Sequence, residues 1–175
     1  MTSTIDETVT GERADLLESL GKHRFFLRFT ARDIDDDQAR RRSTVSELTI
    51  GGLIKHVTFC ERGWARFIVD GANGLPSAED PEALAAHADS FRLGEDETLA
   101  GALAAYDEVA AETDELIRTL PDLDVSHPLP PAPWFAPGAR WSARRVLLHV
   151  IAETSQHAGH ADIVREALDG AKSMG

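Results

Sequence analysis

The chain has little of what disulfide-rich, membrane-embedded or exported proteins need. It contains a single cysteine, Cys60, so no disulfide can form within the chain, and this usage is typical of a reducing compartment. No run of apolar residues approaches the roughly 18 that a membrane-spanning helix requires. The polar, acidic stretch from Met1 to Gly11 has no positively charged start followed by an apolar segment, as a secretory signal would have. We therefore expect a cytoplasmic protein that does not enter a membrane.

Positive charge is also scarce. The 18 Lys and Arg residues stand against 30 Asp and Glu residues, which gives a formal net charge of -12 at pH 7. A surface of this sign repels phosphate backbones and anionic lipids, so neither nucleic acid nor a membrane is an expected partner. Hydrophobic residues make up 42% and charged residues 27% of the chain, which is the mix of a globular protein. We expect residues 1–175 to form one domain, because this length can bury a core of its own.

Strand-like alternation of apolar and polar residues is absent too, whereas four segments carry apolar residues every three or four positions. Such spacing gives an amphipathic helix with one apolar face. Residues that favour helix N-caps precede three of these segments, namely Thr49, Asp96 and Ser142. The predicted helices run from about Glu12 to Thr30, from Thr49 to Asp70, from Asp96 to Leu120, and from Ser142 to about Leu168.

Three connections join these helices. The charged stretch from Arg32 to Arg42 is predicted to be solvated, with room for a helical turn. Gly, Pro and short polar runs between Ala72 and Gly94 indicate a long crossover loop. Six of the eight prolines lie between Pro121 and Arg140, which excludes a helix or a central strand there. Together these features predict an all-α fold, a four-helix bundle with at least one crossover connection.

The fourth helix places ionisable residues where a core should be. Its apolar seam alternates by three and four residues, and two of its seven positions are a glutamate and a histidine: Val146, Val150, Glu153, His157, Ala161, Val164 and Leu168. A carboxylate in a bundle core is costly unless something neutralises its charge, and a metal ion does so. Glu153 and His157 are four residues apart, so they lie one above the other on one face. This spacing suits chelation.

Other histidines extend this pattern. His149 and His160 lie on the same side of the fourth helix, and His56 lies on or beside the apolar stripe of the second. Two histidines and one glutamate make three ligands and leave one coordination position open, as in catalytic zinc sites. The predicted ligands are His56, Glu153 and His157.

Simpler interpretations remain open for several of these residues. A single histidine on an apolar stripe is more often a hydrogen-bonded core residue than a ligand, and Glu153 with His157 could be an ion pair at a solvent-facing edge. His149 and His160 could orient the ligands by hydrogen bonds or contact a neighbouring helix. His87 and His127 fall in predicted loops, where we expect them to be solvated.

Cys60 follows His56 by one helical turn. A lone cysteine on an apolar stripe usually behaves as a small buried hydrophobe, so we interpret it first as a packing residue. Coordination of the metal and attack as a nucleophile are the alternatives.

Two of the helices resemble a known family. The run from Arg144 to Glu166 (RRVLLHVIAETSQHAGHADIVRE), ending in Asp169-Gly170, resembles the last helix of the DinB-like superfamily, above all its mycothiol transferases. The run from Leu48 to Val57 (LTIGGLIKHV), followed by Glu61 and Trp64, resembles the second helix of that branch. The resemblance covers the chain from about residue 16 to residue 170.

The resemblance implies a four-helix bundle with a crossover, often a homodimer, whose divalent metal is held by three residues. One ligand is a histidine of the second helix, matched by His56, and the other two are four residues apart on the fourth, matched by Glu153 and His157. A glutamate at the first of these two positions also occurs in members similar to the mycothiol-dependent maleylpyruvate isomerase. Zinc is the first candidate, with nickel, manganese or iron as alternatives.

The resemblance also implies a metal-dependent transferase that joins a low-molecular-weight thiol, similar to mycothiol, to an electrophilic small molecule. In that reaction His149 or His160 could accept the thiol proton, and both are catalytic candidates. The loops would set substrate specificity, particularly the proline-rich segment with Trp134, Phe135 and Trp141. One alternative is a non-catalytic stress or detoxification protein that binds metal or a small molecule. Another is a purely structural bundle in which Glu153 and His157 form an ion pair without metal.

Overall fold

The computed structural model describes residues 9–75 and 79–173. Most of the stretch from Met1 to Gly11, for which the sequence predicts no secretory signal, therefore lies outside the described residues. Within the described part of the chain, every helix is too short or too polar to serve as a membrane span. The long helices are α1 (Glu12–Thr30), α3 (Ile50–Asp70), α5 (Leu99–Thr119) and α6 (Ala143–Asp169).

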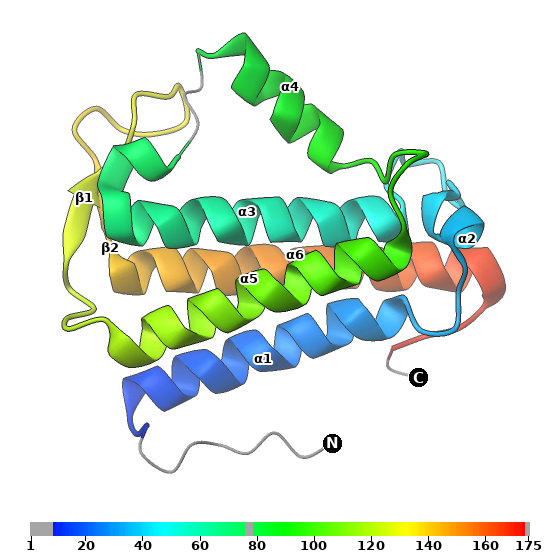
Figure 1. Cartoon of the computed structure of the whole chain (residues 1–175), viewed down its shortest axis with the longest axis horizontal. Coiled ribbons are helices and arrows are strands. Elements are labelled where there is room, and N and C mark those ends of the chain that lie inside the picture. The colour runs from blue at the N-terminus through cyan, green and yellow to red at the C-terminus, as the bar shows by residue number, and fades with distance from the viewer. Residues whose placement is uncertain (1–8, 76–78, 174–175) are drawn as a thin grey trace.

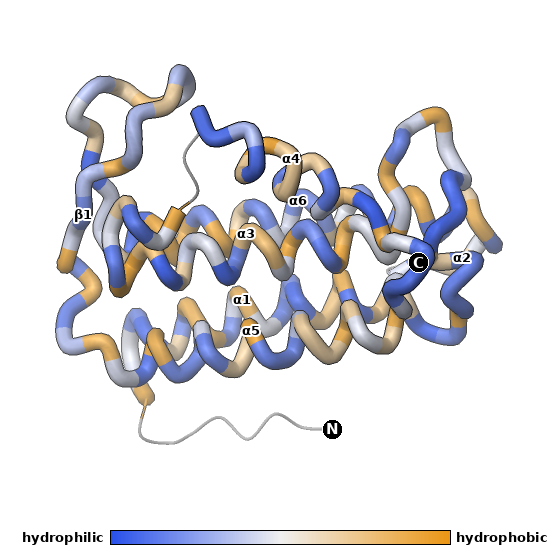
Figure 2. The backbone as a smooth tube through the Cα atoms, turned by 45° about the horizontal axis from the view of Figure 1, so that its top comes forward, coloured by the Kyte–Doolittle hydropathy of each residue, from blue (hydrophilic) through white to orange (hydrophobic). Residues whose placement is uncertain are grey.

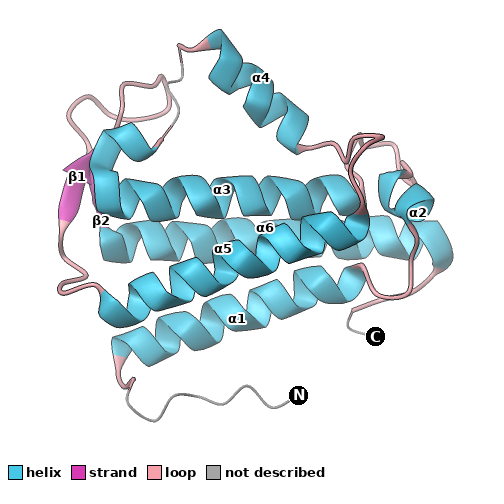
Figure 3. Ribbon diagram, viewed as in Figure 1, coloured by secondary structure: helices cyan, strands magenta, loops and turns pink. Residues whose placement is uncertain are grey.

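These four helices form the bundle, as the sequence predicts. Helix α1 packs along α6, and α3 packs against both α5 and α6. The colour gradient of Figure 1 shows that α3 and α5 run in the same direction, while α1 and α6 run in the opposite one. Parallel neighbours cannot be joined by a short turn, so the chain crosses back over the bundle between α3 and α5 (Figure 3). The predicted crossover connection is thereby confirmed.

The ends of the helices follow from their cap residues. The Thr49 hydroxyl accepts a hydrogen bond from the Gly52 amide at 3.1 Å, and Ser142 caps α6 in the same way. Helix α6 ends at Gly170, whose φ of 81° is the left-handed conformation that glycine adopts without strain. The predicted cap at Asp96 is wrong. Thr98 caps α5 instead, accepting from the Gly101 amide at 3.0 Å, so this helix begins two residues later than a cap at Asp96 would place it.

The crossover is more ordered than the sequence suggests. The stretch from Ala72 to Gly94, predicted as a loop, contains most of a short 3-10 helix, η1 (Gly71–Gly74), and the helix α4 (Pro81–Ser90). Asp80 caps α4, and Pro81 occupies its first turn, where its missing N–H has no cost. The first connection does hold the helical turn for which the sequence leaves room, α2 (Asp36–Arg40).

The proline-rich connection contains two three-residue strands, β1 (Ser126–Pro128) and β2 (Arg140–Ser142). They pair antiparallel, with His127 opposite Trp141, and lie at one end of the bundle (Figure 1). The sequence predicts no strand, because three residues are too few to show alternation. The fold class remains all-α, with this small addition.

Polar side chains divide the core into two hydrophobic clusters, and Figure 2 shows apolar and polar residues alternating along the helices. Leu27, Leu53 and Val164 belong to the first cluster, and Leu20 and Val146 to the second. On several helices, buried or partly buried polar residues lie between members of the two clusters: Arg24, Glu61, Thr113, Glu153 and Thr154. The ionisable residues predicted from the seam therefore belong to a polar layer in the middle of the bundle.

The crossover lies directly on the first turn of α3. A Cβ atom on Gly52 would be 2.0 Å from the Phe91 carbonyl oxygen, and one on Gly51 would be 2.7 Å from a methyl group of Leu93. Glycine inside a helix costs up to about 1 kcal/mol relative to alanine. At these positions it allows the chain after α4 to approach the backbone of α3, which brings Ser90 and Phe91 to the polar layer.

Candidate metal centre

The three predicted ligands lie together between α3 and α6. His157 Nε2 is 3.4 Å from Glu153 Oε2, and the ring centroids of His56 and His157 are 5.0 Å apart. His56 is buried and His157 nearly so, whereas 29% of the Glu153 side chain is exposed. The cluster therefore lies inside the bundle but touches solvent through its carboxylate.

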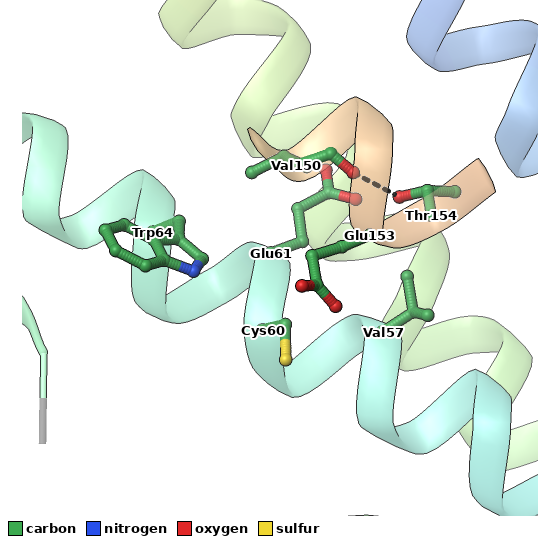
Figure 4. Close-up of a pocket in the computed structure, with 7 residues that line it drawn as sticks. All are labelled: Val57, Cys60, Glu61, Trp64, Val150, Glu153 and Thr154. Carbon is green, nitrogen blue, oxygen red and sulfur yellow. Dashed lines mark hydrogen bonds between the residues drawn. The ribbon is translucent and has the colours of Figure 1, made fainter. Parts of the chain in front are cut away.

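Cys60 lies in the same cluster. Its Sγ is 3.4 Å from His56 Nε2, and Figure 4 shows the Cys60 and Glu153 side chains projecting into the same space from α3 and α6. Donor atoms of His56, Cys60 and Glu153 all lie within 4.8 Å of one another. The predicted ligand His157 is not in this group, although it contacts Glu153. Nitrogen, sulfur and carboxylate donors at such separations fit a borderline-soft divalent ion such as zinc. By position, the half-buried Cys60 could coordinate an ion held there, and packing stays the first interpretation.

Burial and mutual contacts set the protonation of this cluster. Burial, reinforced by His157, lowers the pKa of His56 to about 4, so its imidazole is neutral at pH 7. Burial and the nearby Glu153 carboxylate raise the pKa of the Cys60 thiol to about 12. The hydrogen bond from His157 lowers the pKa of Glu153, which is therefore ionised. A neutral imidazole and a carboxylate are the forms that bind metal.

The two predicted catalytic histidines flank the cluster along α6. His149 Nε2 is 3.8 Å from Glu153 Oε1, and burial lowers the pKa of His149. His160 contacts His157 instead, with 3.4 Å between their Nδ1 atoms. His149 is thus adjacent to the carboxylate and His160 to a histidine of the cluster.

The two histidines that were predicted to lie in solvated loops both contact distant segments. His87 is exposed but lies on α4, and its ring packs edge-on against that of His56 with centroids 5.4 Å apart. His127 lies on β1, is half-buried, and donates from Nε2 to the Ile68 carbonyl at 3.1 Å. His87 is thus exposed as predicted but lies on a helix, whereas His127 is not solvated as predicted, because it packs against a distant segment.

Besides His87, two more residues of the crossover contact His56, and neither could be found from the sequence. Ser90 Oγ lies 2.8 Å from His56 Nδ1, and the Phe91 ring stacks on the imidazole with centroids 3.6 Å apart. Ser90 and His56 are 34 residues apart, and no local pattern links them. Only the packing of α4 onto α3 brings them together.

Aromatic residues line the side of the cluster next to His149. Trp64 and Trp141 stack with centroids 4.9 Å apart, and the His149 ring packs edge-on against both. Phe135 packs edge-on against Trp141 at 5.7 Å. We call Trp64, Phe135 and Trp141 the aromatic wall. Of the three aromatic residues predicted to set specificity, Phe135 and Trp141 belong to it, whereas Trp134 is 66% exposed and contacts Phe135.

A second ionic group lies in the same polar layer. Arg24 pairs with Glu61 through two hydrogen bonds and with Asp114 Oδ1 at 2.7 Å. Arg24 and Glu61 are 6% and 1% exposed. The sequence does carry a signal for them, since each follows a core residue of its helix, Leu20 or Val57, by four positions.

The fold has a solved counterpart, described as the crystal structure of the conserved protein of a locus from Enterococcus faecalis. It has 13% sequence identity and a TM-score of 0.66, with 93% of this chain and 100% of that chain covered, and at this identity the likeness shows the fold alone. The search of curated proteins finds no match. The model of the mycothiol-S-transferase family matches residues 15–170, which agrees with the branch that the two helix motifs predict. The chain therefore belongs to the mycothiol-S-transferase family.

Proposed function

We propose that the protein is a metal-dependent transferase that joins a low-molecular-weight thiol, mycothiol or one similar to it, to an electrophilic small molecule. The observation that supports this proposal is the contact of His157 with both His56 and the partly exposed Glu153 between α3 and α6. The proposed ligand set leaves a coordination position for an external thiol. Family membership supports the same chemistry.

Thiols are weak nucleophiles at neutral pH because most of the population is protonated. A divalent ion held by His56, Glu153 and His157, zinc before nickel, manganese or iron, would lower the pKa of a thiol bound there. His149 would accept the released proton, because its imidazole is adjacent to Glu153 and the aromatic wall. His160 would orient His157 through their nitrogen contact.

The electrophile would bind beside the thiol. The aromatic wall offers stacked indole faces next to His149, and Arg145 lies over the Trp141 ring at 4.0 Å. Such a surface packs against the apolar part of a small molecule while the charged groups stay at its rim.

The test combines metal content with thiol consumption in protein purified without an affinity tag. Wild-type protein should carry one divalent ion per chain and consume mycothiol in the presence of an alkylating electrophile. Glu153→Ala should lose the ion and slow thiol consumption on the order of 100-fold. Glu166→Ala, which removes an exposed carboxylate from the same helix, is the matched control and should change neither quantity. Full activity without metal would overturn the proposal.

A second candidate function is a metal-binding protein without catalysis, and the position of Cys60 favours it. If Cys60 Sγ joins His56, Glu153 and His157, the site is closed and has no place for an external thiol. Our prediction is the open site, in which Cys60→Ala keeps its metal. Thiol added to cobalt-substituted protein should then produce a sulfur-to-metal charge-transfer band. A band that is present before addition and absent in Cys60→Ala would favour the binding protein.

We also propose a homodimer, from the family resemblance alone. Light scattering at micromolar concentration should give twice the chain mass of 19.1 kDa. A monomer mass would remove this part of the proposal and leave the site chemistry unaffected.

A further inference from the structure

His56 takes part in a chain of hydrogen bonds that leads away from the metal cluster. Its Nδ1 contacts Ser90 Oγ at 2.8 Å, and Ser90 Oγ in turn donates to the His87 carbonyl oxygen at 2.6 Å. Ser90 is the last residue of α4 and is 2% exposed, so water cannot replace either partner. The direction of each bond can therefore be worked out from the number of protons available.

The Ser90 hydroxyl has one proton to donate. Two oxygen atoms 2.6 Å apart repel each other unless a proton lies between them, so this proton points at the His87 carbonyl. The end of α4 explains why that carbonyl accepts it. The Phe91 amide bonds to the Ala88 carbonyl, and not to that of His87 one residue earlier, as an α-helix would require. Ser90 Oγ is left to accept, and His56 Nδ1 must donate.

This direction fixes the other nitrogen of the ring. A neutral imidazole carries one proton, so with Nδ1 protonated His56 Nε2 presents a lone pair. Nε2 is the atom that faces Cys60 Sγ at 3.4 Å, whose thiol can donate to it. The stacked Phe91 ring holds the plane of the imidazole, so the lone pair points at the cluster.

We propose that Ser90 is a positioning residue that holds His56 in the Nδ1-protonated tautomer and so directs Nε2 to the metal. Ligating histidines commonly donate their second nitrogen to a fixed acceptor, which orients the ring and strengthens the ligand. Here the acceptor comes from α4, so the crossover helix is part of the site. The metal-binding half of this inference rests on the proposed function, whereas the tautomer does not.

The tautomer can be measured in the metal-free protein. Long-range proton–nitrogen NMR spectra of protein with ring-labelled histidine distinguish a protonated from a bare ring nitrogen. In wild type at pH 7, His56 should show a protonated Nδ1 and a bare Nε2. Ser90→Ala should lose this preference, and Ser90→Thr, which keeps the hydroxyl, should restore it. A protonated Nε2 in wild type, or an unchanged tautomer in Ser90→Ala, would overturn the proposal.

Thr113→Val is the matched control, because it also removes a buried hydroxyl that donates to a helix carbonyl, here that of Val109. It should leave the His56 spectrum unchanged. Competition with a chelator should show a zinc affinity 10- to 100-fold lower in Ser90→Ala, which is about the usual effect of losing such a hydrogen-bond partner of a ligand. The affinity of Thr113→Val should be unchanged. Equal affinity in both variants would refute the positioning role. The predicted tautomer in a protein that binds no metal would refute the proposed function alone.

Discussion

Two groups of ionisable residues share the middle of this bundle, and they differ in how far they satisfy one another. In the first, Arg24 forms a two-pronged pair with Glu61 and a further bond to Asp114. In the second, Cys60 Sγ lies 3.4 Å from His56 Nε2, and His157 Nε2 lies 3.4 Å from Glu153 Oε2. The first group balances a cation against carboxylates. The second combines one carboxylate with imidazole and thiol groups and contains no lysine or arginine.

This difference distinguishes buried polar residues that stabilise the fold from buried polar residues that could bind a ligand. A buried ion pair with short hydrogen bonds has no free donor or acceptor for a ligand, and its residues are held by each other. The second group keeps groups that can bind a cation, among them the His56 Nε2 lone pair and the partly exposed Glu153 carboxylate. Members of both groups, such as Glu61 and His56, follow a core residue of their helix by three or four positions, so only their contacts show which group could bind a metal.

The largest expected effect is on folding stability at the ion pair. Glu61→Ala leaves Arg24 buried with only the partly exposed Asp114, and should lower the free energy of unfolding by about 3 to 5 kcal/mol. Glu153→Ala in metal-free protein should change it by less than about 1 kcal/mol, because 29% of the Glu153 side chain is exposed and its ion-pair partners are histidines. Urea unfolding of both variants measures the contrast. Equal losses would remove the distinction between the two groups.

The next effect is on metal binding, which should depend on the group around His56 and not on the group around Arg24. Alanine at His56, Glu153 or His157 should abolish stoichiometric zinc, with affinity reduced on the order of 100-fold or more. Replacing His87 or His127 should leave the metal content unchanged, even though His87 touches the His56 ring. Elemental analysis after gel filtration gives the answer. Stoichiometric metal in Glu153→Ala would mean that His149 or His160, and not Glu153, is the third ligand.

A pH effect of intermediate size should come from the metal cluster. The pKa of His56 is about 4 in the folded protein, against 6.5 for an unperturbed histidine, so the unfolded chain takes up the proton first as pH falls. The stability of metal-free protein should therefore decrease between pH 6.5 and pH 4, by on the order of 2 kcal/mol. The lowered pKa values of His149 and Glu153 act in the same direction. His56→Gln should flatten this profile, and an unchanged slope would assign it to other groups.

The smallest effect concerns Asp114, the most exposed member of the group around Arg24. Asp114→Asn removes a carboxylate whose side chain is 30% exposed and leaves the Arg24–Glu61 pair in place. We expect a loss of about 1 kcal/mol in the free energy of unfolding and no change in metal content. A loss as large as that of Glu61→Ala would mean that all three residues act as one unit.

Much of the site could be predicted because helical periodicity is a local property. Glu153 and His157 share a face through their spacing alone, and His56 lies on the apolar face of its own helix. In the crossover, where a helix was predicted as loop, the helix signal was present but weaker than its surroundings. Asp80-Pro81 marks the start of α4, yet the flanking Gly and Pro residues favoured a loop across the whole crossover.

The sequence by itself determined the four long helices, most of their caps and the seam of α6 that carries the predicted ligands. Tertiary structure decided which side chains meet across helices. It placed Ser90 and Phe91 on His56, and Cys60 among the predicted ligands. It also placed Arg24 between Glu61 and Asp114, which are 37 and 90 residues away from it along the chain. Cap and periodicity signals depend on residues within one or two turns of each other. Contacts between helices depend instead on crossover geometry and on how closely two backbones approach, as at Gly52, and no local pattern encodes either.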